Sequence, residues 1–133
     1  MVIKSMQHQK TVLVVDDELS VRRLFEAALR GAGFNVRTAE DGLDALQSIR
    51  EQVPNAIVLD LKMPRMDGSE FRRQLLARPH TRQIPVVVVT GFDADPVPEV
   101  VATLRKPLAM EELISAVSQG CGLTSLHRHS PQA

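Results

Sequence analysis

The sequence contains no tryptophan, no tyrosine and only one cysteine, and its 16 basic residues balance its 16 acidic residues. Without aromatic side chains for base stacking and without a basic field, nucleic acid is a poor fit as a ligand. The single thiol, Cys121, cannot form an internal disulfide, which is typical of a reducing compartment. No apolar run reaches membrane-spanning length, and residues 1–10 lack the apolar core of a signal peptide. We therefore expect a cytoplasmic protein without membrane contact.

The chain has 133 residues, 44% of them hydrophobic, which is enough for one domain with a substantial core. We place this domain at residues 11–120, between an N-terminal tail at 1–10 and a C-terminal tail at 121–133. The segment after residue 120 is too short for a helix-turn-helix, so we expect no DNA binding by this chain.

Short apolar runs alternate along the chain with segments of helical periodicity. They predict strands at 12–15, 35–39, 56–60, 86–90 and 100–107, and helices at 20–33, 39–52, 69–78 and 109–120. Ser20 is the candidate N-cap of the first helix, and the apolar faces of the first two helices contain Val21, Leu24, Phe25, Ala28 and Leu29, then Leu43, Leu46 and Ile49. Strands that are apolar throughout and alternate with helices predict a doubly wound α/β domain, with a parallel sheet covered on both faces.

The connection between Thr90 and the last strand differs from the others. It spans roughly ten residues and contains Pro96 and Pro98, whereas a complete crossover with its helix needs at least about 10–12 residues. We therefore expect a shortened or irregular fourth helix.

Polar and charged side chains follow the apolar strands at the points where the strands end. Asp16 and Asp17 follow the first strand, Asp60 ends the third, Thr90 ends the fourth, and Lys106 follows the fifth. Sites in open α/β sheets form outside the carboxyl ends of the strands, so these side chains meet if their strands are neighbours. Each residue alone has an ordinary structural explanation, such as a helix-initiating turn or a solvated lysine. The prediction depends on the combination.

This combination suits one kind of chemistry. Clustered carboxylates repel each other, and a buried charge without a partner is costly. The Lys106 ammonium offers one positive charge, and Mg²⁺, which takes oxygen ligands, would offer two more. A metal, an ammonium and the Thr90 hydroxyl together are suited to stabilise phosphoryl transfer. An aspartate can be the nucleophile in such a reaction, and Asp60 is the best candidate.

The segments "VLVVDDE", "VLDLKMPRMDG", "VVVVTG" and "LRKPL" occur in the order found in one family. Over roughly residues 10–120 the sequence resembles the receiver domain of two-component response regulators. The resemblance implies a flavodoxin-like five-stranded parallel sheet of strand order 2-1-3-4-5. It also implies a phosphorelay protein that takes a phosphoryl group from a histidine kinase or histidine phosphotransfer protein and contacts an unknown downstream protein. Such a chain promotes only its own phosphorylation and dephosphorylation and is not an enzyme in the usual sense.

The resemblance also implies a metal site. Asp17 would bind Mg²⁺ directly and Asp16 partly through water. Asp60 and the backbone carbonyl of Lys62 would complete the protein ligands.

For the phosphoryl group, the resemblance implies that Asp60 is the phosphoacceptor. Lys106 would pair with the Asp60 carboxylate and then with the phosphoryl group, while Thr90 would hydrogen-bond a phosphoryl oxygen. The Lys106–Pro107 peptide bond would be cis.

One position departs from the family pattern. An aromatic residue usually stands three positions before the lysine, where this chain has Thr103. Together with the short fourth helix, this predicts an altered output surface. The first helix would be the kinase-docking surface, and Arg22 and Arg23 on it are interpreted as solvated charges.

Two other families fit the sequence less well. A phosphatase of the haloacid dehalogenase type needs a second aspartate where this chain has Lys62, and a flavin-binding protein needs a phosphate loop where "DDELS" would repel phosphate. A degenerate receiver, acting as a phosphorylation-independent interaction module, stays open because of Thr103 and the short fourth helix. The sequence also leaves open whether the chain is stand-alone or part of a larger protein.

Overall fold

The computed structural model describes residues 10–91 and 97–123, so most of both predicted tails lies outside the described residues. The elements run in the order β1 (Thr11–Val15), α2 (Leu19–Gly31), β2 (Asn35–Ala39), α3 (Gly42–Glu51), β3 (Ala56–Asp60), α4 (Gly68–Leu76), α5 (Pro79–Arg82), β4 (Val86–Thr90), β5 (Ala102–Arg105) and α6 (Met110–Gly120). The predicted alternation of strands and helices is confirmed.

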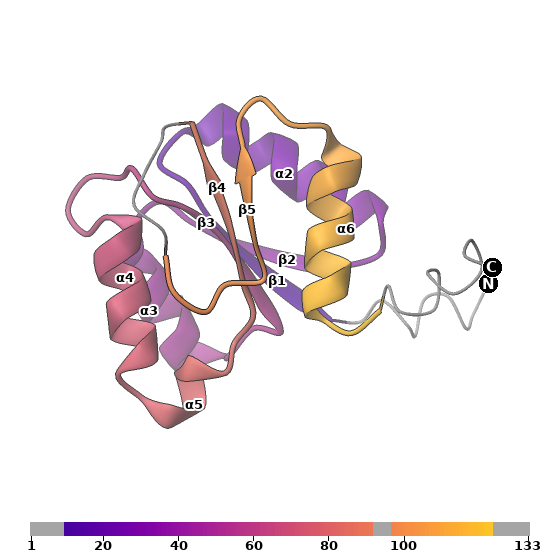
Figure 1. The fold of residues 1–133 in the computed structure, drawn as a ribbon. Coiled ribbons are helices and arrows are strands. Elements are labelled where there is room, and N and C mark those ends of the chain that lie inside the picture. Colours follow the sequence, from indigo (N-terminus) through magenta and orange to yellow (C-terminus); the bar gives the residue numbers. More distant parts are fainter. Residues whose placement is uncertain (1–9, 92–96, 124–133) are drawn as a thin grey trace.

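The five strands form one parallel sheet in the order β2-β1-β3-β4-β5. The predicted doubly wound fold and strand order are therefore confirmed. Helices α2 and α6 cover one face of the sheet, and α3 and α4 cover the other (Figure 1). In the register, Val15 lies beside Leu59 and Asp60 beside Val89, so β1, β3 and β4 end at the same edge.

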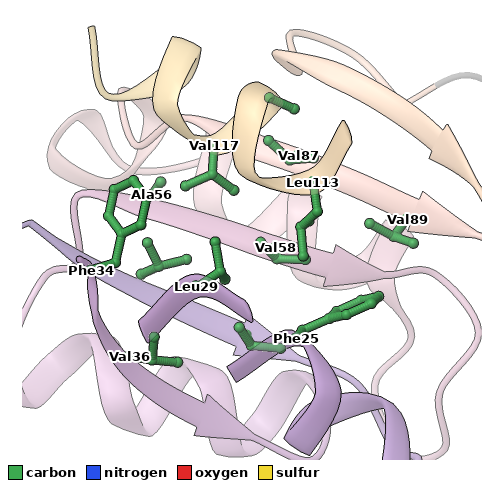
Figure 2. Packing of buried hydrophobic residues seen from close by; sticks show 13 residues of the cluster. Phe25, Leu29, Phe34, Val36, Ala56, Val58, Val87, Val89, Leu113 and Val117 are labelled. Atoms are coloured by element: carbon green, nitrogen blue, oxygen red, sulfur yellow. The ribbon is translucent and has the colours of Figure 1, made fainter. Parts of the chain in front are cut away.

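The core consists of two apolar clusters, one on each face of the sheet. Alternate residues of the central strands point to opposite faces, as the period of a strand requires. Val14 and Val58 pack under α2 and α6, whereas Leu13 and Leu59 pack under α3 and α4. Figure 2 shows the first cluster, in which Phe25 and Leu29 of α2 meet the strands. Burial on both faces explains why these strands are apolar throughout.

Two details of the predicted helices are wrong. Helix α2 begins one residue before Ser20, with Glu18 at the N-cap position and no side-chain capping bond. Leu24 and Leu43, assigned to buried faces, are 53% and 46% exposed. The buried residues nearby in these helices are Phe25 and Ala45, so the apolar stripe that contacts the sheet is narrower than the sequence pattern.

The end of the third predicted helix also differs from the prediction. Helix α4 ends at Leu76, and Pro79 does not simply stop a helix but stands in the first turn of the short α5. Proline suits this place because the first turn needs no backbone N–H donor there. The buried Thr81 hydroxyl donates to the Leu75 carbonyl at 2.7 Å, which ties α5 to α4. None of the helices in the described part of the chain is long and apolar enough to span a bilayer.

The connection between β4 and β5 has no helix among residues 97–101, and residues 92–96 lie outside the described residues. This agrees with the expected shortened or irregular fourth helix. The connection is held by Arg72 of α4, which is 2% exposed and donates to the carbonyls of Pro98 and Glu99 at 3.2 and 2.5 Å. Val97 and Val100 pack against the cluster under α3 and α4. The described part of the connection therefore covers core on this face of the sheet.

Candidate functional site

Three carboxylates gather at the edge where β1 and β3 end. Carboxylate oxygens of Asp16, Asp17 and Asp60, here called the acidic cluster, lie within 4.8 Å of one another. Asp16 and Asp60 are buried and Asp17 is exposed. They meet because β1 and β3 are adjacent and in register at Val15 and Leu59.

Lys106 brings a positive charge to the cluster from the loop after β5. Its ammonium nitrogen lies 3.2 Å from Asp16 Oδ2 and 3.9 Å from Asp60 Oδ2. Its backbone N–H donates to the carbonyl of Thr90 at 2.9 Å, which fixes the loop against the end of β4. The Lys106–Pro107 peptide bond is cis, as predicted. Thr90 is buried at this same edge.

The electrostatics of the cluster centre on Asp60. Burial, together with the neighbouring Asp16 carboxylate, raises the pKa of Asp60 to about 6. The Lys106 ammonium and the backbone N–H of Lys62, which lies 3.4 Å from Asp60 Oδ1, act in the opposite direction. Burial and the Asp16 carboxylate therefore outweigh the Lys106 ammonium in setting the pKa of Asp60.

The backbone around Asp16 is fixed by contacts that the sequence did not reveal. Its N–H donates to the Ala39 carbonyl at 3.1 Å, and its Oδ1 accepts from the Glu18 N–H at 2.9 Å. Arg22 donates from Nη1 to the Asp16 carbonyl at 2.8 Å. The interpretation of Arg22 as a merely solvated charge is therefore wrong. No sequence signal marked it, because an arginine in the first turn of a helix also fits an exposed face.

The loop between β3 and α4 closes tightly behind Asp60. The Gly68 N–H donates to the Leu61 carbonyl at 2.9 Å. A Cβ at Gly68 would lie 2.6 Å from the Asp60 carbonyl oxygen, so only glycine fits here. This close approach explains the glycine that ends the "MDG" segment and holds Lys62 next to the cluster.

Thr103 is the position at which the sequence departs from the family pattern. Thr103 lies on β5, beside Val88 of β4, and its side chain is exposed. It is thus an exposed residue on β5, at the end of the strand order.

The donors at this edge fit a hard divalent cation. The acidic cluster supplies carboxylate oxygens from three residues, and a Lys62 carbonyl would add a fourth oxygen ligand. Mg²⁺ is bound through carboxylates and retained waters, and one exposed member of the cluster, Asp17, leaves access from solvent. Burial and the neighbouring Asp16 carboxylate both disfavour the ionised form of Asp60, and a bound cation would oppose this effect because an opposite charge favours the carboxylate.

Residues 12–118 match the response regulator receiver domain family. The chain belongs to this family. The matched residues lie inside the predicted domain at 11–120, whose boundaries stay a prediction. Phosphoacceptor chemistry is the activity expected of a receiver domain.

Relatives and solved structures agree with this assignment. The response regulator MprA of Mycobacterium sp. (strain KMS) is 41% identical over 112 residues, which cover 78% of this chain and 47% of MprA. This chain thus spans about half the length of the curated relatives it matches. The chemotaxis response regulator CheY4 of Vibrio cholerae superposes with a TM-score of 0.75 at 28% identity, covering 84% of this chain and 98% of CheY4. The receiver domain of the sensor histidine kinase PA1611 from Pseudomonas aeruginosa PAO1 was solved with a magnesium ion in its active site cleft. It superposes with a TM-score of 0.79 at 26% identity, covering 86% of this chain and 98% of that domain.

Proposed function

We propose that Asp60 accepts a phosphoryl group from a histidine kinase or histidine phosphotransfer protein in a Mg²⁺-dependent reaction. The observation that carries this proposal is the convergence of the acidic cluster with the Lys106 ammonium at the carboxyl edge of the sheet. Asp16, Asp17, Asp60 and the Lys62 carbonyl would hold the metal. The magnesium ion in the cleft of the PA1611 receiver domain supports this assignment.

In the proposed reaction, an Asp60 carboxylate oxygen forms a bond to phosphorus while the bond from phosphorus to the donor's histidine nitrogen breaks. The electron pair of the broken bond stays on that nitrogen, which takes a proton from solvent. Lys106, 3.9 Å from Asp60 Oδ2, would orient the attacking carboxylate and offset charge on the phosphoryl group. The Thr90 hydroxyl would donate to a phosphoryl oxygen. Mg²⁺, when bound, supplies charge neutralisation for the phosphoryl oxygens.

The reactive form of Asp60 is the carboxylate. With a pKa of about 6, Asp60 is largely ionised near pH 7 even before a cation binds. Mg²⁺ would favour the ionised form further, because an opposite charge nearby lowers the pKa of a carboxyl group.

Intact-mass spectrometry after incubation with acetyl phosphate tests the proposal. We expect the wild-type protein to gain one phosphoryl group in the presence of Mg²⁺ and none when EDTA removes the metal. The Asp60→Asn variant should gain none under either condition. If the wild-type protein gains nothing from acetyl phosphate or from a phosphorylated histidine phosphotransfer domain, the proposal is wrong and the phosphorylation-independent interaction module takes its place.

A protein donor needs a docking surface beside Asp60, and an apolar groove lies next to Lys106. The groove has a volume of about 190 Å³ and is lined by Val21, Leu24, Phe25, Lys106, Pro107, Leu108 and Met110. It lies between α2 and the loop that carries Lys106. We propose that the donor protein packs on this groove, with the half-exposed Leu24 at the contact.

Replacing Leu24 with glutamate should slow transfer from a phosphorylated histidine phosphotransfer domain about 10-fold or more. Loss of the burial of the exposed half of Leu24, together with the desolvation of a carboxylate in an apolar contact, should cost about 1.4 kcal/mol or more, which corresponds to about a factor of ten in affinity. Phosphorylation by acetyl phosphate should be unchanged, because the small donor needs no docking surface. The matched control is Leu43→Glu, since Leu43 is similarly exposed on α3, on the opposite face of the sheet. Equal rates for the two variants with the protein donor would contradict the docking site.

A further inference from the structure

The loop between β3 and α4 is joined to the start of α3 by an ion pair. Arg65 Nε lies 2.6 Å from Asp41 Oδ2, and Arg65 Nη2 contacts the same oxygen. The Asp41 side chain is 4% exposed, whereas that of Arg65 is 55% exposed. The two residues are 24 positions apart, so the pair links two loops at the carboxyl edge of the sheet.

Asp41 is well suited to be the fixed partner. Its Oδ1 caps α3 by accepting from the Asp44 N–H at 2.9 Å, so its position is set by the helix. Burial alone would raise the pKa of Asp41, but the Asp44 N–H and the Arg65 guanidinium outweigh burial and hold this pKa below its ordinary value. Asp41 is therefore ionised at neutral pH, and the pair with Arg65 is a pair of full charges.

The loop needs such a restraint because its backbone is bent at Arg65. Arg65 has φ of 62°, in the left-handed region that residues other than glycine rarely adopt. A second tie lies beside the ion pair, since the Gly42 N–H donates to the Met66 carbonyl at 3.3 Å. A Cβ at Gly42 would lie 2.8 Å from Met66 Cγ, so the two loops pack without spare room.

The restrained loop is the one that carries Lys62. Its near end closes through the Gly68 N–H on the Leu61 carbonyl, and the Lys62 N–H lies 3.4 Å from Asp60 Oδ1. Lys62 therefore stands between the phosphoacceptor and the part of the loop that Asp41 holds.

We infer that the Arg65–Asp41 pair positions the Lys62 carbonyl as a ligand of the metal site. Neither Arg65 nor Asp41 touches the metal; both act through the backbone of the loop. The inference rests on the proposed function, because it assigns a role in the binding of Mg²⁺ at the acidic cluster.

The direction in which each of two substitutions changes Mg²⁺ affinity separates a positioning role from a simple charge effect. If the pair acted only through its charges, Asp41→Asn would weaken Mg²⁺ binding by removing a negative charge. Arg65→Gln would then strengthen Mg²⁺ binding by removing a positive charge. If the pair holds the loop, both substitutions weaken Mg²⁺ binding, and the double variant is no weaker than either single variant.

Isothermal titration calorimetry of the full chain with MgCl₂ measures this directly. We expect each single variant and the double variant to bind Mg²⁺ about 3- to 30-fold more weakly than the wild type. Loss of an outer-shell partner of a metal ligand typically lowers metal affinity about 10- to 100-fold, and this pair acts on the ligand only through the backbone. Asp41→Asn keeps an oxygen that can cap α3, so the fold should be preserved, which circular dichroism checks. The matched control is the exposed Arg73–Glu70 pair on α4, whose Arg73→Gln and Glu70→Gln variants should bind Mg²⁺ like the wild type.

A metal-free measurement completes the test. In the absence of Mg²⁺, we expect the Gly42 amide proton to exchange with solvent faster in both single variants, because its bond to Met66 loosens with the loop. Opposite effects of the two variants on the Mg²⁺ Kd, or unchanged Kd values, would overturn the inference while leaving the proposed function intact. If the wild type binds no Mg²⁺ at all, the proposed function fails and the inference fails with it.

Discussion

Replacing Lys106 with methionine is expected to slow phosphorylation of Asp60 by acetyl phosphate by about 100- to 1,000-fold, the usual effect of removing one group that stabilises charge in a transition state. Lys106 lies 3.9 Å from Asp60 Oδ2 and 3.2 Å from Asp16 Oδ2. No other ammonium or guanidinium group forms an ion pair with the acidic cluster among the described residues. Methionine keeps an unbranched apolar chain in place of the lysine and removes the charge together with the hydrogen bond to Asp16.

A second effect of this substitution acts in the same direction. The Lys106 ammonium lowers the pKa of Asp60, so its removal lets this pKa rise above about 6 and reduces the ionised fraction near pH 7. The loss of rate should therefore become smaller as pH rises from about 6 to 8, because Asp60 is then ionised in both proteins.

The rate should be measured by intact-mass spectrometry at saturating Mg²⁺ over a series of times. Lys10→Met is the matched control, because Lys10 directly precedes β1, at the opposite edge of the sheet. This control should react like the wild type. A Lys106→Met rate within threefold of the control would rule out the proposed role of Lys106.

Much of the fold could be predicted because the central strands are continuous apolar runs. Residues such as Val12 to Val15 and Val86 to Val89 are buried on both faces of the sheet, so both faces of each strand had to be apolar. Such runs are typical of parallel sheets. The strand order, by contrast, followed from the family resemblance, since apolar runs alone do not say which strands are neighbours.

The members of the acidic cluster could also be predicted, because each stands directly at the end of a strand or in the loop after it. The rule that parallel strands present their carboxyl ends at one edge brings them together once the strands are neighbours, and that adjacency followed from the family resemblance. What the sequence could not give is the balance of charges, because the pKa of Asp60 depends on burial and on distances to Asp16 and Lys106.

Contacts between a side chain and a distant backbone carbonyl carried no sequence signal. Arg72 binds the carbonyls of Pro98 and Glu99, and Arg22 binds that of Asp16. Every residue has a carbonyl, so no residue type marks the acceptor, and an arginine within a helix is most often exposed. Leu24 belongs to the apolar face of the helical pattern and is nevertheless exposed, because only packing decides which side of that face meets the sheet.

Asp60→Asn is expected to make the metal-free protein more stable at pH 7.5, although it removes the proposed phosphoacceptor. The folded protein holds the pKa of Asp60 at about 6, compared with the ordinary value of 3.8 for an aspartate in an unfolded chain. A raised pKa means that folding disfavours the carboxylate. At about 1.4 kcal/mol per pKa unit, the gain in the free energy of unfolding is about 2–3 kcal/mol as an upper range.

The dependence on pH follows from the direction of the shift. Well below pH 3.8, Asp60 is protonated in both the folded and the unfolded protein, so its charge makes no difference to stability. Between about 3.8 and 6 the unfolded protein has largely lost this proton while the folded protein still holds it, and the stability of the wild type falls as pH rises. Above pH 6 the loss is complete. The stability difference between Asp60→Asn and the wild type should therefore be small at pH 4 and reach its full value near pH 7.

Urea denaturation followed by circular dichroism measures this difference, since a chain without tryptophan and tyrosine offers little intrinsic fluorescence. Mg²⁺ should stabilise the wild type, because a ligand of the folded state raises the free energy of unfolding. The stability difference between Asp60→Asn and the wild type should therefore become smaller. Asp17→Asn is the control for loss of one negative charge at an exposed position of the same cluster, and its gain should be smaller. An Asp60→Asn variant that is no more stable than the wild type at pH 7.5, or whose gain does not change with pH, would show that the buried carboxylate is already compensated within the folded protein.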